Sequence, residues 1–329
     1  MPASHSQPEP VARHARREAQ ERLGFDGRYE ARVLEPAPPA VTQPPWFADD
    51  PIALEPREPG RLIVSPVGNG DVLWDELAQG DEQLARWCAR RWLGAYARLG
   101  APPAELGRTR RALHGLAEHV ISPTRRRANG KIGLRYTLDG FGTPFFGNDV
   151  QIRIAADVMI VQVGDRVHSG RLTTLADAAE FIGFDLTRFD LAGADRPLHV
   201  DPESSRFLGD WFGFATSVLQ QMRVESPSEL EGSRVQLWPE HFDMSIELGS
   251  ERAGARATFG FSPGDDQHEQ PYVYVAPWTG APGGELWRAR GFDGAELGCS
   301  ELLEADDQRE AALAFLRLRR DALAAGRER

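Results

Sequence analysis

Apolar and polar residues alternate along several short segments of this chain, and in other segments the apolar residues recur every three or four positions. Alternation is typical of strands with one buried face, and the longer spacing is typical of helices. Alternating or continuous apolar runs predict strands at 132–136, 150–154, 158–163, 166–172, 235–248, 255–261 and 272–278. Gly164-Asp165 between two of these runs indicates a hairpin.

Helical spacing and capping residues predict five helices. They lie at 84–99, at 106–120, after Thr174, after Asp201 and at 308–325. Pro123 is expected to end the second, and Asp201 followed by Pro202 is a favourable helix start. Helices and strands come in blocks joined by short turns. The sequence therefore predicts an α+β fold with mainly antiparallel sheets, an N-terminal helical pair, two central helices and a C-terminal helix.

The chain of 329 residues divides into an arm and a body. Eight prolines fall between Pro36 and Pro59, and such a density prevents both helix and sheet ladders. We interpret residues 1–59 as an extended or disordered arm, and residues 60–326 as one globular α+β body. With only two cysteines, Cys88 and Cys299, the chain has neither a disulfide framework nor a cysteine-based zinc site.

The net charge of −11 disfavours a general nucleic-acid binder, because an acidic surface repels phosphate backbones. The sequence has no apolar run long enough to span a membrane and no apolar secretory leader, so we expect a cytoplasmic protein with reduced thiols. Glycine-rich turns such as Gly68-Asn69-Gly70 lack the third glycine of a dinucleotide loop. No cofactor is predicted, and the sequence says nothing about oligomeric state.

Basic residues gather in one region despite the acidic total. Residues 84–131 hold eleven of them against two acidic residues. They are Arg86, Arg90, Arg91, Arg98, Arg108, Arg110, Arg111, Arg125, Arg126, Arg127 and Lys131. The simpler interpretation is that this segment packs against the acidic remainder of the chain. The alternative is that its helices dock an anionic ligand or an acidic partner.

Three glycines and three phenylalanines lie within Gly140–Gly147, which we interpret as a loop between strands. Its phenylalanines are expected to fill the core. A lid with glycine hinges is the functional alternative.

The candidate site lies on the strand predicted at 235–248. Side chains of a strand alternate between its faces, so Phe242, Met244, Ile246 and Leu248 would point to the core. His241 and Asp243 would then stand side by side on the other face, about 6–7 Å apart. Asp243 could hold the His241 imidazole in one tautomer and raise its basicity, as acid–base catalysis requires.

A second predicted strand, 272–278, extends this surface. Val273 and Val275 would face the core, which places Tyr272, Tyr274 and Trp278 on the opposite face. If both strands share a sheet, a face lined by histidine, aspartate and tyrosine results, and its rings could stack on a planar ligand. The preceding loop would add Asp265, Asp266, His268 and Glu269 at the rim.

Three functions are compatible with these residues. The leading hypothesis is small-ligand binding, with His241 and Asp243 as acid–base groups and Tyr272, Tyr274, Trp278, Asp265 and His268 as ligand contacts. Lys131, the single lysine in an arginine-rich chain, is a further ligand-binding candidate. A second hypothesis is a protein that docks an acidic partner. A third is a metal-dependent hydrolase in which two histidines and a carboxylate hold Zn²⁺ or Fe²⁺.

Several segments also resemble an uncharacterised bacterial protein family over about residues 60–325. They are Ala128–Arg135, Gly140–Gly147, Val235–Asp243, Ser262–Asp265, Gln270–Tyr272 and Ala312–Leu318. Parts are similar to a bacterial domain of unknown function with a Gly-Lys strand, a His-Phe-Asp strand, a Pro-Tyr strand and a closing helix. The resemblance implies one body from about residue 60 onward and no particular activity.

Overall fold

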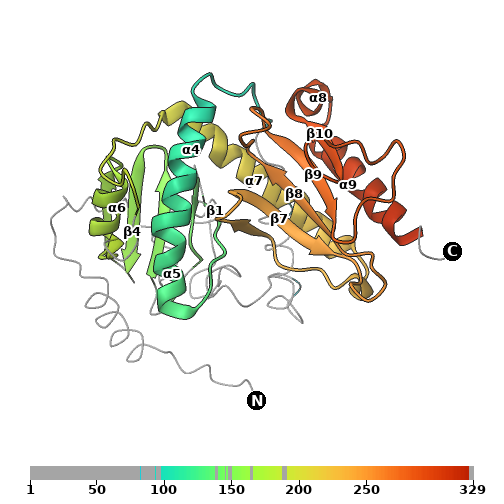
Figure 1. Ribbon diagram of the computed structural model, residues 1–329, viewed down its shortest axis with the longest axis horizontal. Coiled ribbons are helices and arrows are strands. Elements are labelled where there is room, and N and C mark those ends of the chain that lie inside the picture. Colours follow the sequence, from blue (N-terminus) through green and yellow to red (C-terminus); the bar gives the residue numbers. More distant parts are fainter. Residues whose placement is uncertain are drawn as a thin grey trace, which may run out of the picture.

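The computed structural model has an α+β fold built from helices and two five-stranded antiparallel sheets (Figure 1). It describes residues 98–325 apart from 138–139, 145, 147–149, 164–165 and 187–190, together with positions 82 and 93. The predicted arm at 1–59, a short strand that the apolar run Leu62-Ile63-Val64 predicts, and nearly all of the helix predicted at 84–99 lie outside the described residues. The extent of the body therefore stays a prediction.

The first sheet has the strand order β1-β2-β3-β4-β5. Its strands are β1 (Arg135–Thr137), β2 (Gly140–Gly142), β3 (Val150–Ala155), β4 (Val158–Val163) and β5 (Arg166–Arg171). The β4–β5 hairpin is confirmed. The interpretation of Gly140–Gly147 as a loop was wrong for its first three residues, because β2 lies between β1 and β3. Phe141 and Phe146 are buried, as predicted.

The second sheet has the order β10-β9-β8-β7-β6. Its strands are β6 (Gln236–Trp238), β7 (Asp243–Leu248), β8 (Ala257–Ser262), β9 (Tyr272–Pro277) and β10 (Ala295–Gly298). The continuous strand predicted at 235–248 was wrong. A turn at 239–242 separates β6 from β7, and Phe242 occupies left-handed backbone with φ of 54°. Pro239 offers no backbone N–H for a sheet ladder, which favours the break.

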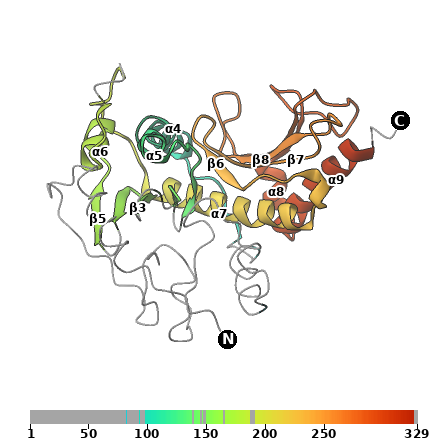
Figure 2. The ribbon, with the colours of Figure 1, turned by 90° about the horizontal axis from the view of Figure 1, so that it is seen from below.

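The two sheets meet at one bridge and share one long helix. Leu134, just before β1, and Leu237 of β6 exchange two backbone hydrogen bonds of 2.7 and 2.9 Å. The helix α7 (Pro202–Glu225) runs along the same side of both sheets (Figure 2). Its Phe212 ring contacts Phe141 of the first sheet and Phe242 in the turn before β7. One hydrophobic core therefore extends across both halves.

Helix α7 starts as the sequence predicts. The Asp201 side chain accepts a 2.8 Å hydrogen bond from the backbone N–H of Ser204, and Pro202 occupies the first turn. Such a cap satisfies a backbone donor that the first helical turn leaves without a partner. The helix is buried along most of its length, with Trp211 and Phe212 fully enclosed.

The helix expected to stop at Pro123 instead continues beyond it. α4 (Leu106–Leu116) leads through a π-helical turn, η2 (Ala117–Ile121), into α5 (Ser122–Asn129). Proline within a helix removes a hydrogen bond and crowds a carbonyl of the preceding turn. A widened turn before Pro123 is a distortion that accommodates both effects. Gly130, with φ of 77°, ends the helix.

Four shorter or terminal elements complete the described fold. They are α6 (Leu175–Phe181), η4 (Ser228–Leu230), α8 (Cys299–Glu304) and α9 (Gln308–Ala325). Thr174 caps α6, and α9 coincides with the predicted C-terminal helix. α9 packs against α7, β9 and β10, so helices cover the face of the second sheet that carries Val273 and Val275. Within the described residues, no helix combines the length and apolar character needed to cross a membrane.

Candidate functional site

A cavity of about 820 Å³ lies on the face of the second sheet opposite α7. In Figure 2, α4 and the loops that follow β8 and β9 lie on this side of the sheet. Small-molecule sites commonly have volumes of about 300–1,000 Å³. The lining residues are His114, Ile132, Trp238, Glu240, His241, Asp243, Ser245, Glu247, Thr258, Ser262, Asp265, Asp266, Gln267, His268, Tyr272, Tyr274, Ala276, Gly291 and Phe292.

The buried carboxylate of Asp243 is the central polar group of this cavity. Its Oδ2 accepts a hydrogen bond from the Tyr274 hydroxyl, whereas Oδ1 is buried without a hydrogen-bond partner among the described residues. Burial raises the pKa of Asp243 to about 6, although the Tyr274 hydrogen bond and the nearby His241 charge act in the opposite direction. Asp243 can therefore gain or lose a proton close to neutral pH.

Tyr274 reaches Asp243 by crossing the strand between them. β8 lies between β7 and β9, and Gly260 of β8 pairs with both Ser245 and Tyr274. Tyr274 also interacts with the Ser245 hydroxyl, and burial together with the Asp243 charge raises the pKa of Tyr274 well above its usual value. The phenol consequently remains a proton donor toward Asp243 at neutral pH.

A second set of hydrogen bonds among tyrosine, aspartate and serine lies beside the one formed by Tyr274, Asp243 and Ser245. The Tyr272 hydroxyl donates a 2.8 Å hydrogen bond to Asp265 Oδ2 and interacts with the Ser262 hydroxyl. Burial and the Asp265 carboxylate raise the pKa of Tyr272. Partial burial of Asp265 favours its neutral form, but hydrogen bonds from Tyr272 and the loop backbone outweigh this effect and lower the pKa of Asp265. Asp265 is therefore the stronger acid of the two.

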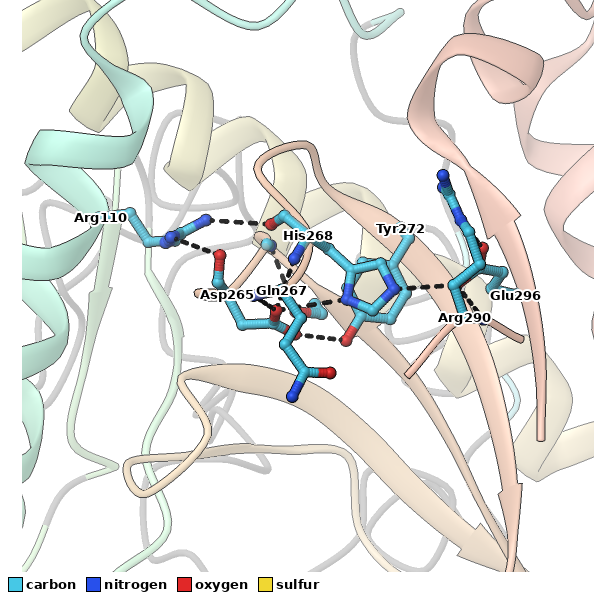
Figure 3. Close-up of polar contacts among 9 residues, drawn as sticks. Arg110, Asp265, Gln267, His268, Tyr272, Arg290 and Glu296 are labelled. Carbon is cyan, nitrogen blue, oxygen red and sulfur yellow. Dashed lines mark hydrogen bonds and ion pairs between the residues drawn. The ribbon is translucent and has the colours of Figure 1, made fainter. Parts of the chain in front are cut away.

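The loop between β8 and β9 is held around His268 (Figure 3). The imidazole lies between two carboxylates, with Nδ1 3.2 Å from Asp265 Oδ1 and Nε2 3.1 Å from Glu296 Oε2. Arg290 pairs with Glu296 at 2.7 Å. His268 is 9% exposed and lines the cavity. Its ring packs on Tyr272, with centroids 4.5 Å apart.

Arg110 of α4 holds the loop between β8 and β9 through hydrogen bonds to its backbone. Its guanidinium donates to the backbone carbonyls of Asp265 at 2.9 Å and His268 at 3.5 Å (Figure 3). Gly264, with φ of 95°, lies so close to Arg110 that a Cβ atom there would be 2.4 Å from Nη1. The arginine and the glycine together set the position of Asp265 and His268 at the edge of the cavity.

Aromatic rings form one wall of the cavity. The centroids of Tyr272, Tyr274 and Phe292 lie 6.0–6.2 Å from one another. Sequence reasoning missed Phe292, because it lies in the irregular connection between β9 and β10. It also missed His114, whose ring stacks on Phe242 at 5.5 Å. His114 lies on the face of α4 that meets the sheet, and only the tertiary packing reveals this proximity.

The predicted site residues are only partly brought together. His241, Asp243, Tyr272, Tyr274, Asp265 and His268 all line the cavity. His241 is exposed in the turn before β7, so its expected position beside Asp243 on one strand was wrong. Whether any of these residues binds a ligand or transfers a proton stays a prediction.

Two other candidates lie outside this lining. Trp278 is 48% exposed beyond the end of β9, where its ring nitrogen donates to Thr258 at 3.2 Å and the Arg256 guanidinium lies 5.2 Å from its centroid. Lys131 is exposed, and only its neighbour Ile132 reaches the cavity. Among the residues that the structure describes, no group of three or more His, Cys, Asp or Glu side chains is arranged to hold a metal ion.

Several arginines of the basic segment bind within the protein itself. Arg98 donates to the carbonyls of Leu303, Ala305 and Asp306, and Arg125 donates to the carbonyl of Gly133. Burial lowers the pKa of Arg125 to about 10. With Arg110, these contacts agree with packing against the rest of the chain, although the acceptors are backbone carbonyls rather than carboxylates. Arg86, Arg90 and Arg91 lie outside the described residues.

No protein-family model, curated protein or solved structure matches this chain. The resemblance to an uncharacterised bacterial family therefore stays a prediction.

Proposed function

We propose that this protein binds a small polar molecule in the cavity on the second sheet, with Asp243 as the group that recognises the molecule and exchanges a proton with it. The observation that carries the proposal is the unpartnered Oδ1 of a carboxylate that is only 3% exposed. Leaving a buried polar atom without a hydrogen bond costs about 1–3 kcal/mol. A ligand that donates a hydrogen bond to Asp243 would recover that cost.

The surrounding residues support this function. The two Tyr–Asp hydrogen bonds, the His268 contacts and the Arg110 contacts fix the polar groups before any ligand arrives. Such preorganisation reduces the entropy lost on binding. A carboxyl group whose pKa lies near 6 is suited to proton transfer near neutral pH, and the exposed His241 side chain lines the same cavity.

Ligand-observed NMR tests the proposal. The probes are small amines, amino alcohols, nucleosides, monosaccharides and carboxylic acids, each added to the full chain at about pH 7.5, where Asp243 is ionised. We expect at least one class to bind the unaltered chain and to bind Asp243→Asn at least about tenfold more weakly. Asp195→Asn is the matched control, because Asp195 is an exposed residue of a loop in the other half.

Two results would contradict the proposal. One is that none of these probes binds, and the other is that Asp243→Asn binds them as tightly as Asp195→Asn does. Tyr274→Phe provides a second variant if Asp243→Asn fails to fold. It removes the hydroxyl donor to Asp243 and keeps the ring, so it is expected to alter affinity while the cavity wall stays in place.

A further inference from the structure

The charges that line the cavity are strongly one-sided. Five carboxylates line it, on Glu240, Asp243, Glu247, Asp265 and Asp266, whereas neither lysine nor arginine is present in the lining. Glu247 is paired with Arg256 at 3.0 Å, but Glu240, Asp243 and Asp266 take part in no ion pair with other described residues. A recess with carboxylates on low-dielectric walls concentrates cations and repels anions.

Charge alone does not identify a ligand, but Asp243 adds a separate constraint. Its unpartnered Oδ1 is a hydrogen-bond acceptor, so the atom that satisfies it must carry a hydrogen. A hydrogen bond between an ammonium or guanidinium N–H and a carboxylate is roughly twice as strong as one between neutral groups. A positively charged N–H donor therefore meets both the hydrogen-bond requirement of Oδ1 and the charge preference of the cavity.

The aromatic wall adds a third constraint. Tyr272, Tyr274 and Phe292 line the cavity together with Asp243, and the Tyr274 hydroxyl donates a hydrogen bond to that carboxylate. Aromatic faces attract cations that lie within about 6 Å of the ring centroid, and they also pack against hydrocarbon. The wall is therefore suited to an organic body attached to the charged group.

From these three features we infer that the ligand is an organic cation with N–H donors, namely a protonated amine or a guanidinium group carried on a small apolar or aromatic body. Its N–H group donates to Asp243, Glu240 and Asp266 supply attraction at longer range, and the three rings contact its carbon skeleton. This inference rests on the proposed function, because it specifies the class of molecule that the same cavity holds.

Matched probes separate the charge and the donor. Benzylamine carries both, benzyl alcohol keeps the donor without the charge, benzyltrimethylammonium keeps the charge without an N–H, and benzoate reverses the charge. Affinities for the full chain are measured by titration calorimetry at about pH 7.5, where Asp243 is ionised. We expect benzylamine to bind at least about tenfold more tightly than each of the other three. That preference should disappear in Asp243→Asn and persist in Asp195→Asn.

The possible outcomes distinguish this inference from the proposed function. If benzyl alcohol or benzoate binds as tightly as benzylamine, and Asp243→Asn weakens that binding, the inference of a cationic ligand is wrong, whereas the proposed binding of a small molecule in the cavity is supported. If benzyltrimethylammonium binds as tightly as benzylamine, the ligand needs no N–H donor to Asp243, and that part of the inference is wrong. If none of the four binds, the cation is rejected, and the broader NMR probes then decide whether the cavity binds any small molecule.

Discussion

The Tyr274 ring lies directly over Gly260, and only glycine at that position allows it. A Cβ atom on Gly260 would be 2.5 Å from two ring carbons of Tyr274 and 2.6 Å from its hydroxyl oxygen. The missing side chain lets the phenol cross β8 and donate to Asp243 on β7. The geometry of the buried acid therefore depends on a residue that has no functional group.

Replacing Gly260 by alanine should displace Tyr274 and destabilise the protein by about 1–3 kcal/mol, because a new methyl group must fit into a closely packed site. Denaturant unfolding measures the change. Gly298→Ala in β10 of the same sheet is the control, since its nearest atoms would be 3.7 Å away. In a Tyr274→Ala background the cost of Gly260→Ala should fall sharply. An equal cost in both backgrounds would show that the ring is not the obstacle.

Asp243 should make stability depend on pH in a specific direction. Its pKa is about 6 in the folded protein against an ordinary value of 3.8, so between these pH values the folded state binds the proton more tightly than the unfolded state does. The free energy of unfolding contributed by this group consequently decreases as pH rises through this window, by up to about 3 kcal/mol.

Asp243→Asn should remove that pH dependence. We expect the stability of the variant relative to the unaltered chain to increase as the pH is raised from about 4 to about 7.5, measured by denaturant unfolding at each pH. Asp195→Asn should show no such trend, because Asp195 is exposed. Parallel stability curves for Asp243→Asn and the unaltered chain would mean that Asp243 titrates near its ordinary value in the folded protein.

Arg110→Lys should loosen the loop that carries Asp265 and His268. Lysine retains the charge but lacks the fork of donors that reaches both carbonyls, so a loss of about 1–3 kcal/mol is expected. Hydrogen exchange at the amides of Gln267 and His268 should become faster. Arg108→Lys, on the exposed side of the same helix, should leave both quantities unchanged. Unaltered exchange in Arg110→Lys would exclude this arginine as the support of the loop.

Cys299 should react slowly with iodoacetamide in the folded protein. The side chain is 2% exposed, and burial raises the pKa of its thiol to about 11, so little thiolate is present at about pH 8. The measurement uses Cys88→Ser, in which Cys299 is the remaining cysteine. Alkylation should accelerate strongly in guanidinium chloride. Rapid modification without denaturant would show that α8 opens readily.

The sequence predicted the elements whose burial alternates regularly. Met244, Ile246, Leu248, Val273 and Val275 are all buried where a period of two places them. The break at 239–242 was missed although Pro239 lies inside the run, and proline within such a run argues against a central strand. The strand β2 was missed because Gly140 and Gly142 resemble loop residues, whereas each lies too close to β3 for a side chain.

The alternation of side chains along each strand predicted only part of the candidate site. It places Asp243 and Tyr274 on one face of the sheet. Which strands are neighbours, and in what register, depends on contacts between residues that are distant in sequence. The parts played by Gly260, Arg110 and Phe292 follow from that register and from loops without periodicity. No pattern along the chain therefore indicated them.

The bridge between Leu134 and Leu237 has a consequence for solubility during folding. An unpaired strand edge is a template for pairing with another molecule, and such pairing leads to aggregation. By exchanging these hydrogen bonds, the two sheets pair with each other at their inner edges. Substitutions that break this bridge should therefore leave an unpaired strand edge on each sheet and promote aggregation.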